Sequence, residues 1–257
     1  MQRYREDKID RVRELAMQVL QKIHVESAYA NVALAQTLRD TQLAERDRRF
    51  LTELVYGVTK AGESLDYMIG QYVADIRKAQ PAIRELLRLG FYQIFVMDRV
   101  PPSAACNTAV ELAKKHGRRG ADSFVNGVLR AALRAPERAA LPTGRDARAL
   151  ALRSWHPAWM VERWMRAYGY ERTEALCLCN NTSAPLSVRV NTLRMNRSAL
   201  MEQFVVAGAE ARASQWVPDG IVLHAHGALD DLPPLRAGLA QVQDESSMLV
   251  AHVLGAE

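Results

Sequence analysis

The side chains in this sequence that could bind a metal are two cysteines and two histidines at short spacing. Cys177 and Cys179 lie two residues apart in a segment of helical periodicity, so they point to different faces. His224 and His226 are also two apart, in a strand-like stretch where they share a face. A structural zinc site needs four ligands, and no second pair follows either of these. We therefore expect no metal site, the cysteines at core or semi-buried helix positions, and the histidines on a surface strand.

No residues are arranged for nucleophilic or phosphate-binding chemistry. The Gly-rich patterns of dinucleotide-binding and P-loop proteins are missing from the sequence, and no Ser/His/Asp arrangement rises above chance. Cys106 is far in sequence from any candidate base, and His156 stands at the expected start of a helix. Asp230 and Asp231 precede two prolines and predict a loop. We expect no catalytic residue and no cofactor site in these 257 residues.

Positive charge is concentrated in one part of the chain. The net charge is +5, but residues 1–150 carry +7 and residues 151–257 carry −2. Residues 114–153 alone hold ten basic and three acidic side chains. Such a surface attracts polyanions by Coulomb attraction and counterion release. The stretch is therefore either a nucleic-acid interface or a solvated helix face followed by a flexible linker.

Arginine outnumbers lysine by 28 to 6. The guanidinium fork suits phosphates and base edges better than an ammonium group does. Genome composition is the other explanation of this bias.

Apolar residues at helical spacing predict an all-α domain over residues 1–135. A linker is predicted over 136–150, which contain two prolines and a glycine. The expected helices cover residues 8–23, 28–38, 50–58, 65–73, 81–95, 102–116 and 124–133.

Residues 151–257 are predicted to form a small α+β domain, so the protein is mainly α. Helices are expected from residue 157 and over 172–179, 198–206 and 246–254. Strands are expected over 186–191, 215–217, 221–223 and 239–242, with a turn at 218–220.

The composition, with 49% hydrophobic and 25% charged residues, is that of a globular protein and excludes disordered, collagen-like and coiled-coil classes. No run of 18 apolar residues predicts a membrane span, and the N-terminus lacks the apolar core of a secretory leader. Three cysteines fit a reducing compartment. We expect a cytoplasmic protein without a membrane partner.

Blocks that occur in order along the first part resemble the NusB-like RNA-binding domain, an all-helical fold. The resemblance covers nearly all of residues 5–134. The blocks are ERDRRF at 45–50, LVYGV at 54–58, LD at 65–66, IRELLRLG at 83–90, VPP at 100–102, NTAVELAK at 107–114 and FVNGVLR at 124–130.

The second part resembles the segment before the catalytic core of bacterial 16S ribosomal RNA 5-methylcytosine methyltransferases, the Sun/Fmu (RsmB-type) family. The resemblance rests on WHPAW at 155–159, LSVRVNT at 186–192 and VQDESS at 242–247. In that family a Rossmann-like domain follows, which binds S-adenosylmethionine and carries two catalytic cysteines. Cys106, Cys177 and Cys179 do not lie in those motifs. The resemblance thus implies the N-terminal portion of a methyltransferase, inactive alone, with no cofactor in this chain.

The resemblance implies that this portion positions 16S ribosomal RNA for a C-terminal methyltransferase domain. Arg189 and Asn191 lie in the recurring strand and either touch RNA or orient the next domain. Arg11 and Arg13 on the first helix are candidates too, a solvated face being the alternative. The other expected RNA contacts are Lys114, Lys115, Arg118, Arg119, Arg130, Arg134 and Arg153.

Two other roles are compatible with the sequence. One is a non-enzymatic NusB-like RNA-binding or transcription antitermination module, against which the α+β extension argues. The other is a structural part that docks on the catalytic domain.

Overall fold

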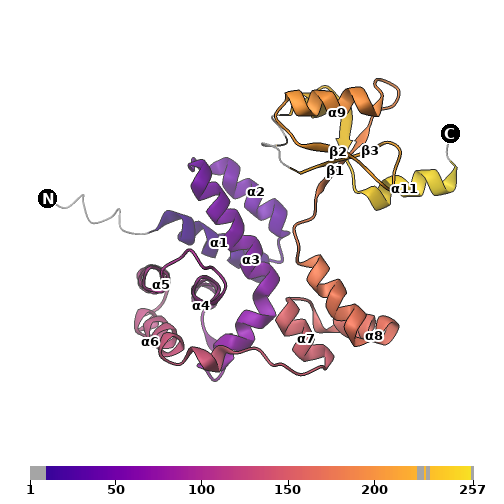
Figure 1. Cartoon of the computed structure of the whole chain (residues 1–257). Helices are drawn as coiled ribbons and strands as arrows, with labels where there is room; N and C mark the ends of the chain where they lie inside the picture. Colours follow the sequence, from indigo (N-terminus) through magenta and orange to yellow (C-terminus); the bar gives the residue numbers. More distant parts are fainter. Residues whose placement is uncertain (1–9, 225–228, 230–231, 256–257) are drawn as a thin grey trace. The chain divides into compact units, whose positions relative to one another are not determined.

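The computed structural model describes residues 10–224, 229 and 232–255 (Figure 1). The chain divides into two compact units, one reaching to Cys179 and one beginning at Asn180. The first unit is helical, and the second contains a four-stranded sheet. The prediction of a mainly α protein, with a helical domain followed by a small α+β part, is confirmed.

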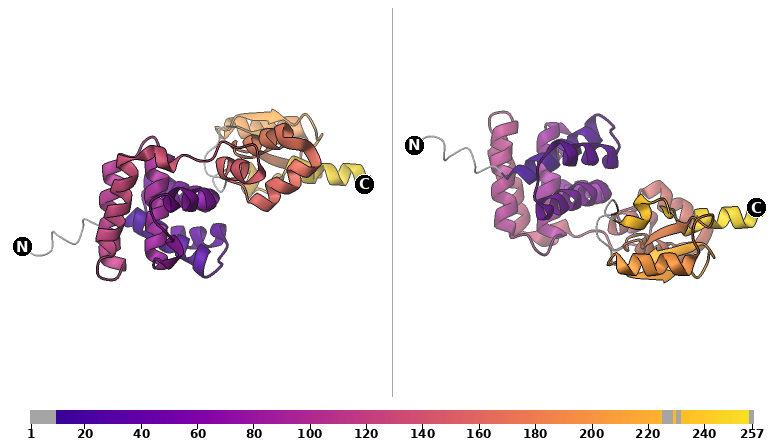
Figure 2. Two further views of the ribbon diagram at one scale, coloured as in Figure 1. Left: turned by 90° about the horizontal axis from the view of Figure 1, so that it is seen from below. Right: turned by 90° about the horizontal axis from the view of Figure 1, so that it is seen from above.

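In the first unit, helix α4 lies among α1, α3, α5 and α6, and Figure 2 shows this bundle from two more directions. The α-helices are α1 (Arg11–Val25), α2 (Ala30–Asp40), α3 (Glu45–Gly70), α4 (Pro81–Phe95), α5 (Pro102–His116), α6 (Ala121–Arg134), α7 (Ala147–Ser154) and α8 (Ala158–Asn180). Two short 3-10 helices are η2 (Ile76–Lys78) and η3 (Pro136–Ala139).

Helix α4 is mostly buried because apolar residues cover most of its surface, while its charged residues Arg84, Glu85 and Arg88 share one side. Pro81 begins it at a position where a backbone N–H would have no helical partner. Leu86, Leu87 and Phe91 are among its fully buried side chains. At Gly90, a β-carbon would lie only 2.8 Å from the Leu129 side chain of α6, so a glycine permits close packing there.

Helix α3 is continuous over Glu45–Gly70, so the prediction of two helices at 50–58 and 65–73 was wrong. Nothing between the two apolar stretches breaks a helix, since the sequence there has one glycine and no proline. Gly62 is tolerated in the helix interior. Ser64 and Leu65 are buried, which shows that packing holds this region in place.

Residues 136–150 contain more structure than their composition suggests. They include η3 and the start of α7, and Ala139 is buried in the core of the bundle. Ser64 Oγ of α3 donates a hydrogen bond of 2.6 Å to the carbonyl of Leu152, and Trp155 packs against the same core. The contacts therefore group α7 and most of α8 with the helical unit, whereas the sequence suggested a domain boundary near residue 150.

In the second unit, an antiparallel sheet has the strand order β2-β3-β1-β4. Alternate residues of β1, including Val188 and Val190, are buried in one cluster with Leu200 and Phe204 of α9. This alternation leaves the other sheet face without α9. The elements are β1 (Leu186–Val190), α9 (Arg197–Val206), β2 (Ala211–Ala213), β3 (Gly220–Leu223), α10 (Pro233–Arg236), β4 (Ala240–Val242) and α11 (Glu245–Leu254).

The strand predicted over 215–217 was wrong, because a side chain takes over the local hydrogen bonding. Ser214 Oγ accepts hydrogen bonds from the amides of Trp216 and Val217 at 3.1 and 3.0 Å. This turn competes with strand pairing. The strand instead covers Ala211–Ala213, which pairs with β3.

Candidate nucleic-acid interface

Four predicted cations come together where α5 ends and α6 begins. Lys114 and Lys115 close α5, and Arg118 and Arg119 lie in the connecting turn; all four are exposed. The turn is tight because of its glycines: a β-carbon on Gly117 would lie 2.4 Å from that of Ala121, and Gly120 has a φ of 86°. The glycines thus allow a tight turn, and the four charged side chains beside it are open to solvent.

Beside this turn lies a hollow of about 480 Å³ with apolar walls and a basic edge. Val73, Ile83 and Phe124 line it, and Phe124 keeps 39% of its surface exposed. We call this hollow and its cations the α5–α6 rim; the cations are Lys78, Arg118 and Arg119, and Lys114 lies outside the lining.

The charge of the α5–α6 rim is positive because its acidic member is already paired. Asp75 lines the hollow, but its carboxylate accepts a hydrogen bond of 2.9 Å from Arg77 Nε. Hydrogen bonding to Arg77 holds the pKa of Asp75 below its ordinary value, so it stays ionised and paired. The amide of Arg118 donates to Gln80 Oε1 at 3.0 Å, which fixes the turn against the start of α4.

Lys115, in contrast, points to another helix. Its Nζ lies 2.9 Å from Glu14 Oε1 of α1, and His116 Nε2 lies 2.5 Å from the same oxygen. Burial works against the ionised Glu14, but the hydrogen bonds from Lys115 and His116 outweigh it and lower the pKa of Glu14. Lys115 therefore ties α5 to α1.

Arg130 and Arg134 lie in the second half of α6, more than about 13 Å along the helix from the turn. Both are exposed, and Arg130 Nε donates to Asn126 Oδ1 at 2.8 Å. The structure thus separates these two predicted contacts from the hollow.

Arg153 is held by protein groups. Its guanidinium donates to the carbonyls of Pro142 and Gly144 at 2.7 and 2.9 Å, and to the hydroxyl of Tyr170 at 2.9 Å. These bonds fasten the loop before α7 to α8. The Arg153 guanidinium thus has a role within the protein.

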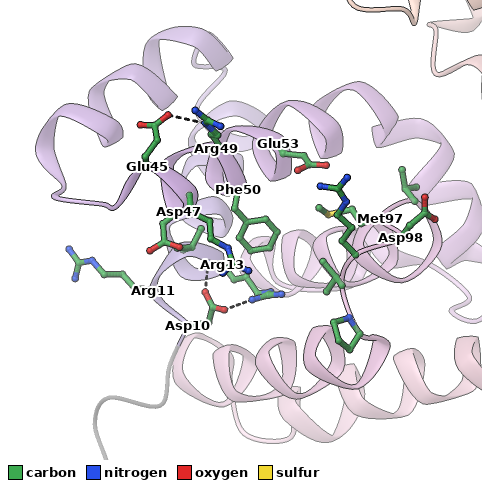
Figure 3. Close-up of a pocket in the computed structure, with 16 residues that line it drawn as sticks. Asp10, Arg11, Arg13, Glu45, Asp47, Arg49, Phe50, Glu53, Met97 and Asp98 are labelled. Atoms are coloured by element: carbon green, nitrogen blue, oxygen red, sulfur yellow. Dashed lines mark hydrogen bonds and ion pairs between the residues drawn. The ribbon is translucent and has the colours of Figure 1, made fainter. Parts of the chain in front are cut away.

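The two predicted cations of α1 line a second, larger cavity of about 1120 Å³ (Figure 3). Arg11 is exposed, but the Arg13 side chain is only 12% exposed. Arg13 forms an ion pair with the N-cap Asp10, donates to Gln93 Oε1, and lies over the Phe50 ring at 4.9 Å. The Arg13 guanidinium thus has several protein partners.

In the second unit, Arg189 lies on the sheet face away from α9. It is exposed, and its strand partners are Gly220 and Gln241. Asn191 is half-buried, and its side-chain amide donates to the carbonyl of Gly238 at 3.1 Å. Asn191 therefore holds a loop, whereas Arg189 is open to solvent.

The hollow contains two residues that sequence reasoning missed as site residues. Lys78 lies in a segment without a basic cluster. Phe124 shares the helical spacing of the α6 core residues, which favoured a core position. Only the packing of η2 and α4 beside the α5–α6 turn brings these side chains together.

The cysteine and histidine candidates remain separate. Cys177 is buried and Cys179 is exposed, and burial raises the pKa of the buried Cys106 thiol. Among the described residues, no three His, Cys, Asp or Glu side chains are grouped as metal ligands would be. His224 is exposed just after β3, while His226, Asp230 and Asp231 lie outside the described residues.

In the described part of the chain, no helix combines the length and apolar character needed to span a bilayer.

Comparison with known proteins assigns both parts of the chain. Residues 10–134 match the NusB family, and residues 156–230 match the Methyltr_RsmF/B-like, ferredoxin-like domain. A probable ribosomal RNA small subunit methyltransferase B of Bacillus subtilis is 35% identical over 243 residues, which are 95% of this chain and 54% of that protein. Its counterpart in Synechocystis is 36% identical, with 94% and 55% covered.

A solved structure supports the same fold. The crystal structure of PH0851 superimposes with a TM-score of 0.64 at 20% identity, over 95% of this chain and 54% of that one. The resemblance inferred from the sequence is thus confirmed. The chain thus consists of a NusB-family domain followed by a Methyltr_RsmF/B-like, ferredoxin-like domain, is similar to relatives named ribosomal RNA small subunit methyltransferase B, and spans about half the length of the curated relatives it matches.

Proposed function

We propose that the α5–α6 rim binds single-stranded RNA. The observation that carries this proposal is the Phe124 ring in an apolar hollow edged by Lys78, Arg118 and Arg119. An aromatic face accepts an unstacked base, and adjacent cations hold the flanking phosphates. An unpaired stretch can turn its bases out in this way, whereas the bases of a duplex stay stacked.

The rim is tested by fluorescence anisotropy with a labelled single-stranded fragment of 16S ribosomal RNA. We expect Arg118→Ala/Arg119→Ala to weaken binding about tenfold or more at low salt and to reduce the salt slope by about 1.4, since each lost phosphate contact on a single strand lowers it by about 0.7. The matched control is Arg39→Ala/Lys60→Ala, which removes two exposed cations from α2 and α3. Equal losses in both double variants would show nonspecific attraction and contradict the proposal.

We further propose that the protein positions 16S ribosomal RNA, in the cytoplasm, for cytosine-5 methylation. The names of the relatives, together with the basic rim, support this role. S-adenosylmethionine would supply the methyl group, but the residues of this chain do not fit it. The described sheet is antiparallel, whereas a Rossmann-like site needs the carboxyl ends of parallel strands. We place the cofactor site and methyl transfer in the portion of the relatives that this chain does not span.

The 257-residue chain alone is therefore expected to incorporate no methyl group into 16S ribosomal RNA from labelled S-adenosylmethionine. Incorporation would contradict the proposed location of the chemistry. RNA binding that depends on the rim, together with no incorporation, is the expected pair of results. If the rim variants bind RNA normally, the result would favour the alternative that the helical unit docks on the catalytic domain.

A further inference from the structure

The larger cavity in the helical unit, here called the polar cavity, is built from three segments. They are the start of α1, the start of α3, and the loop that follows α4. Figure 3 shows the Phe50 ring at the centre, with Arg11 and Asp47 on one side and Met97 and Asp98 on the other. The volume of about 1120 Å³ exceeds the roughly 300–1,000 Å³ of most small-molecule sites, so several side chains of a partner could enter.

The charges of the polar cavity balance, unlike those of the α5–α6 rim. Five arginines and five carboxylates line it: Arg11, Arg13, Arg46, Arg49, Arg99, Asp10, Glu45, Asp47, Glu53 and Asp98. A polyanion gains nothing from counterion release at a neutral surface and is repelled by each carboxylate. The balance therefore disfavours RNA as the occupant.

Part of this charge is already paired within the protein. Arg13 pairs with Asp10, and Arg49 Nε lies 2.9 Å from Glu45 Oε1. The remaining charged residues of the cavity form no ion pair within the described part of the chain. They are Arg11, Arg46, Arg99, Asp47, Glu53 and Asp98. A partner can therefore meet unpaired charges of both signs.

Apolar side chains form the floor of the polar cavity. Phe50 and Met97 line it and are half-buried, so part of each side chain is open; the Arg13 guanidinium carbon lies 4.9 Å from the centroid of the Phe50 ring. An apolar anchor side chain can pack on this floor while charged neighbours reach the rim. Proteins recognise extended peptides through such a combination of an anchor pocket and complementary charges.

We propose that the polar cavity docks a protein partner through an extended segment in which an apolar side chain lies between acidic and basic residues. This site is separate from the α5–α6 rim and does not depend on RNA binding there. The unit thus offers one surface of positive charge and one surface of balanced charge.

The test uses a phage-displayed library of random 12-residue peptides, selected on the whole 257-residue chain. We expect enriched peptides that carry both charge signs around an apolar residue and that bind equally well with excess single-stranded RNA. Arg46→Glu/Glu53→Lys should weaken these peptides about tenfold or more, because both side chains are exposed and each reversal places like charges opposite one another. RNA binding by this variant should not change.

The matched control is Arg39→Glu/Glu63→Lys, which reverses two exposed charges outside the cavity and should leave peptide affinity unchanged. The circular dichroism spectra of both variants verify the fold. Three results would each overturn the proposal: no enriched peptide, enriched peptides of a single charge sign, or enriched peptides that RNA displaces. Loss of RNA binding in the rim variants alone leaves this proposal standing, so the two proposals fail separately.

Discussion

His24 Nδ1 on α1 lies 3.0 Å from Oε2 of the buried Glu85 carboxyl on α4, and this contact connects the two helices. The Glu85 side chain has no exposed surface, and its other oxygen accepts from Arg88 Nη1 at 2.9 Å. Arg88 in turn binds both carboxylate oxygens of Asp66 on α3, at 2.7 and 2.6 Å. Three helices of the bundle thus share one polar network, in which Glu85 is enclosed on both sides by partners.

Removal of Glu85 should destabilise the helical unit strongly. Glu85→Ala leaves Arg88, which is 14% exposed, without one of its two acidic partners and opens a cavity in the core. Breaking a buried pair in this way costs about 3–5 kcal/mol, measured as the free energy of unfolding in urea. Glu63→Ala, at an exposed position of α3, should change it by less than about 0.5 kcal/mol. A small loss for Glu85→Ala would show that the network adds little to stability.

Acid should weaken the attachment of α5 to α1 through Glu14. The folded pKa of Glu14 lies below its ordinary value of 4.5, because the bonds from Lys115 and His116 outweigh its burial. The ionised group therefore stabilises the fold above that value, and this contribution is lost as the pH falls through the folded pKa. Glu14→Gln should flatten the decline of unfolding free energy below pH 4.5, as followed by urea titrations at a series of pH values. An unchanged decline would argue against the ion pair.

The aromatic ring of the α5–α6 rim should matter for RNA affinity. Phe124→Ala is expected to weaken binding of single-stranded RNA by about 1–3 kcal/mol, the usual value of one base stacked on an aromatic ring. Leu133→Ala is the control, because Leu133 lies on the same helix and is 38% exposed, against 39% for Phe124. Fluorescence anisotropy measures both. Equal affinities of the two variants would place the base elsewhere.

Two glycines of α3 should respond in opposite ways to alanine. A β-carbon on Gly57 would lie 2.1 Å from the Tyr92 hydroxyl, so Gly57→Ala should destabilise by about 1–3 kcal/mol through overpacking. Nothing lies within 4 Å of a β-carbon on Gly62, so Gly62→Ala should stabilise by up to about 1 kcal/mol through helix propensity. Thermal unfolding followed by circular dichroism distinguishes them. The same sign for both variants would contradict the packing of α3 on α4.

Local patterns predicted most elements, because an amphipathic helix is specified by the spacing of its own residues. The breaks at Pro81, Pro101 and Gly117 placed α4 and α5 to within a residue or two. The spacing of apolar residues mispredicted two elements, one where a side chain forms a turn and one where a single long helix spans two apolar stretches. Ser214 replaced a strand by a turn, and α3 continued through a stretch with weak periodicity.

The helical class, the family resemblance and the concentration of positive charge can all be read from the amino-acid sequence, because they depend on residue types and local spacing. Which cations are available follows from the packing of the helices, because the partners of a guanidinium are distant in sequence. Arg13 and Arg153 are held by protein groups, whereas Arg118 and Arg119 stand at an open hollow. The hollow itself exists only where η2, α4 and α6 pack side by side, so no local pattern could reveal Lys78 and Phe124 as its lining.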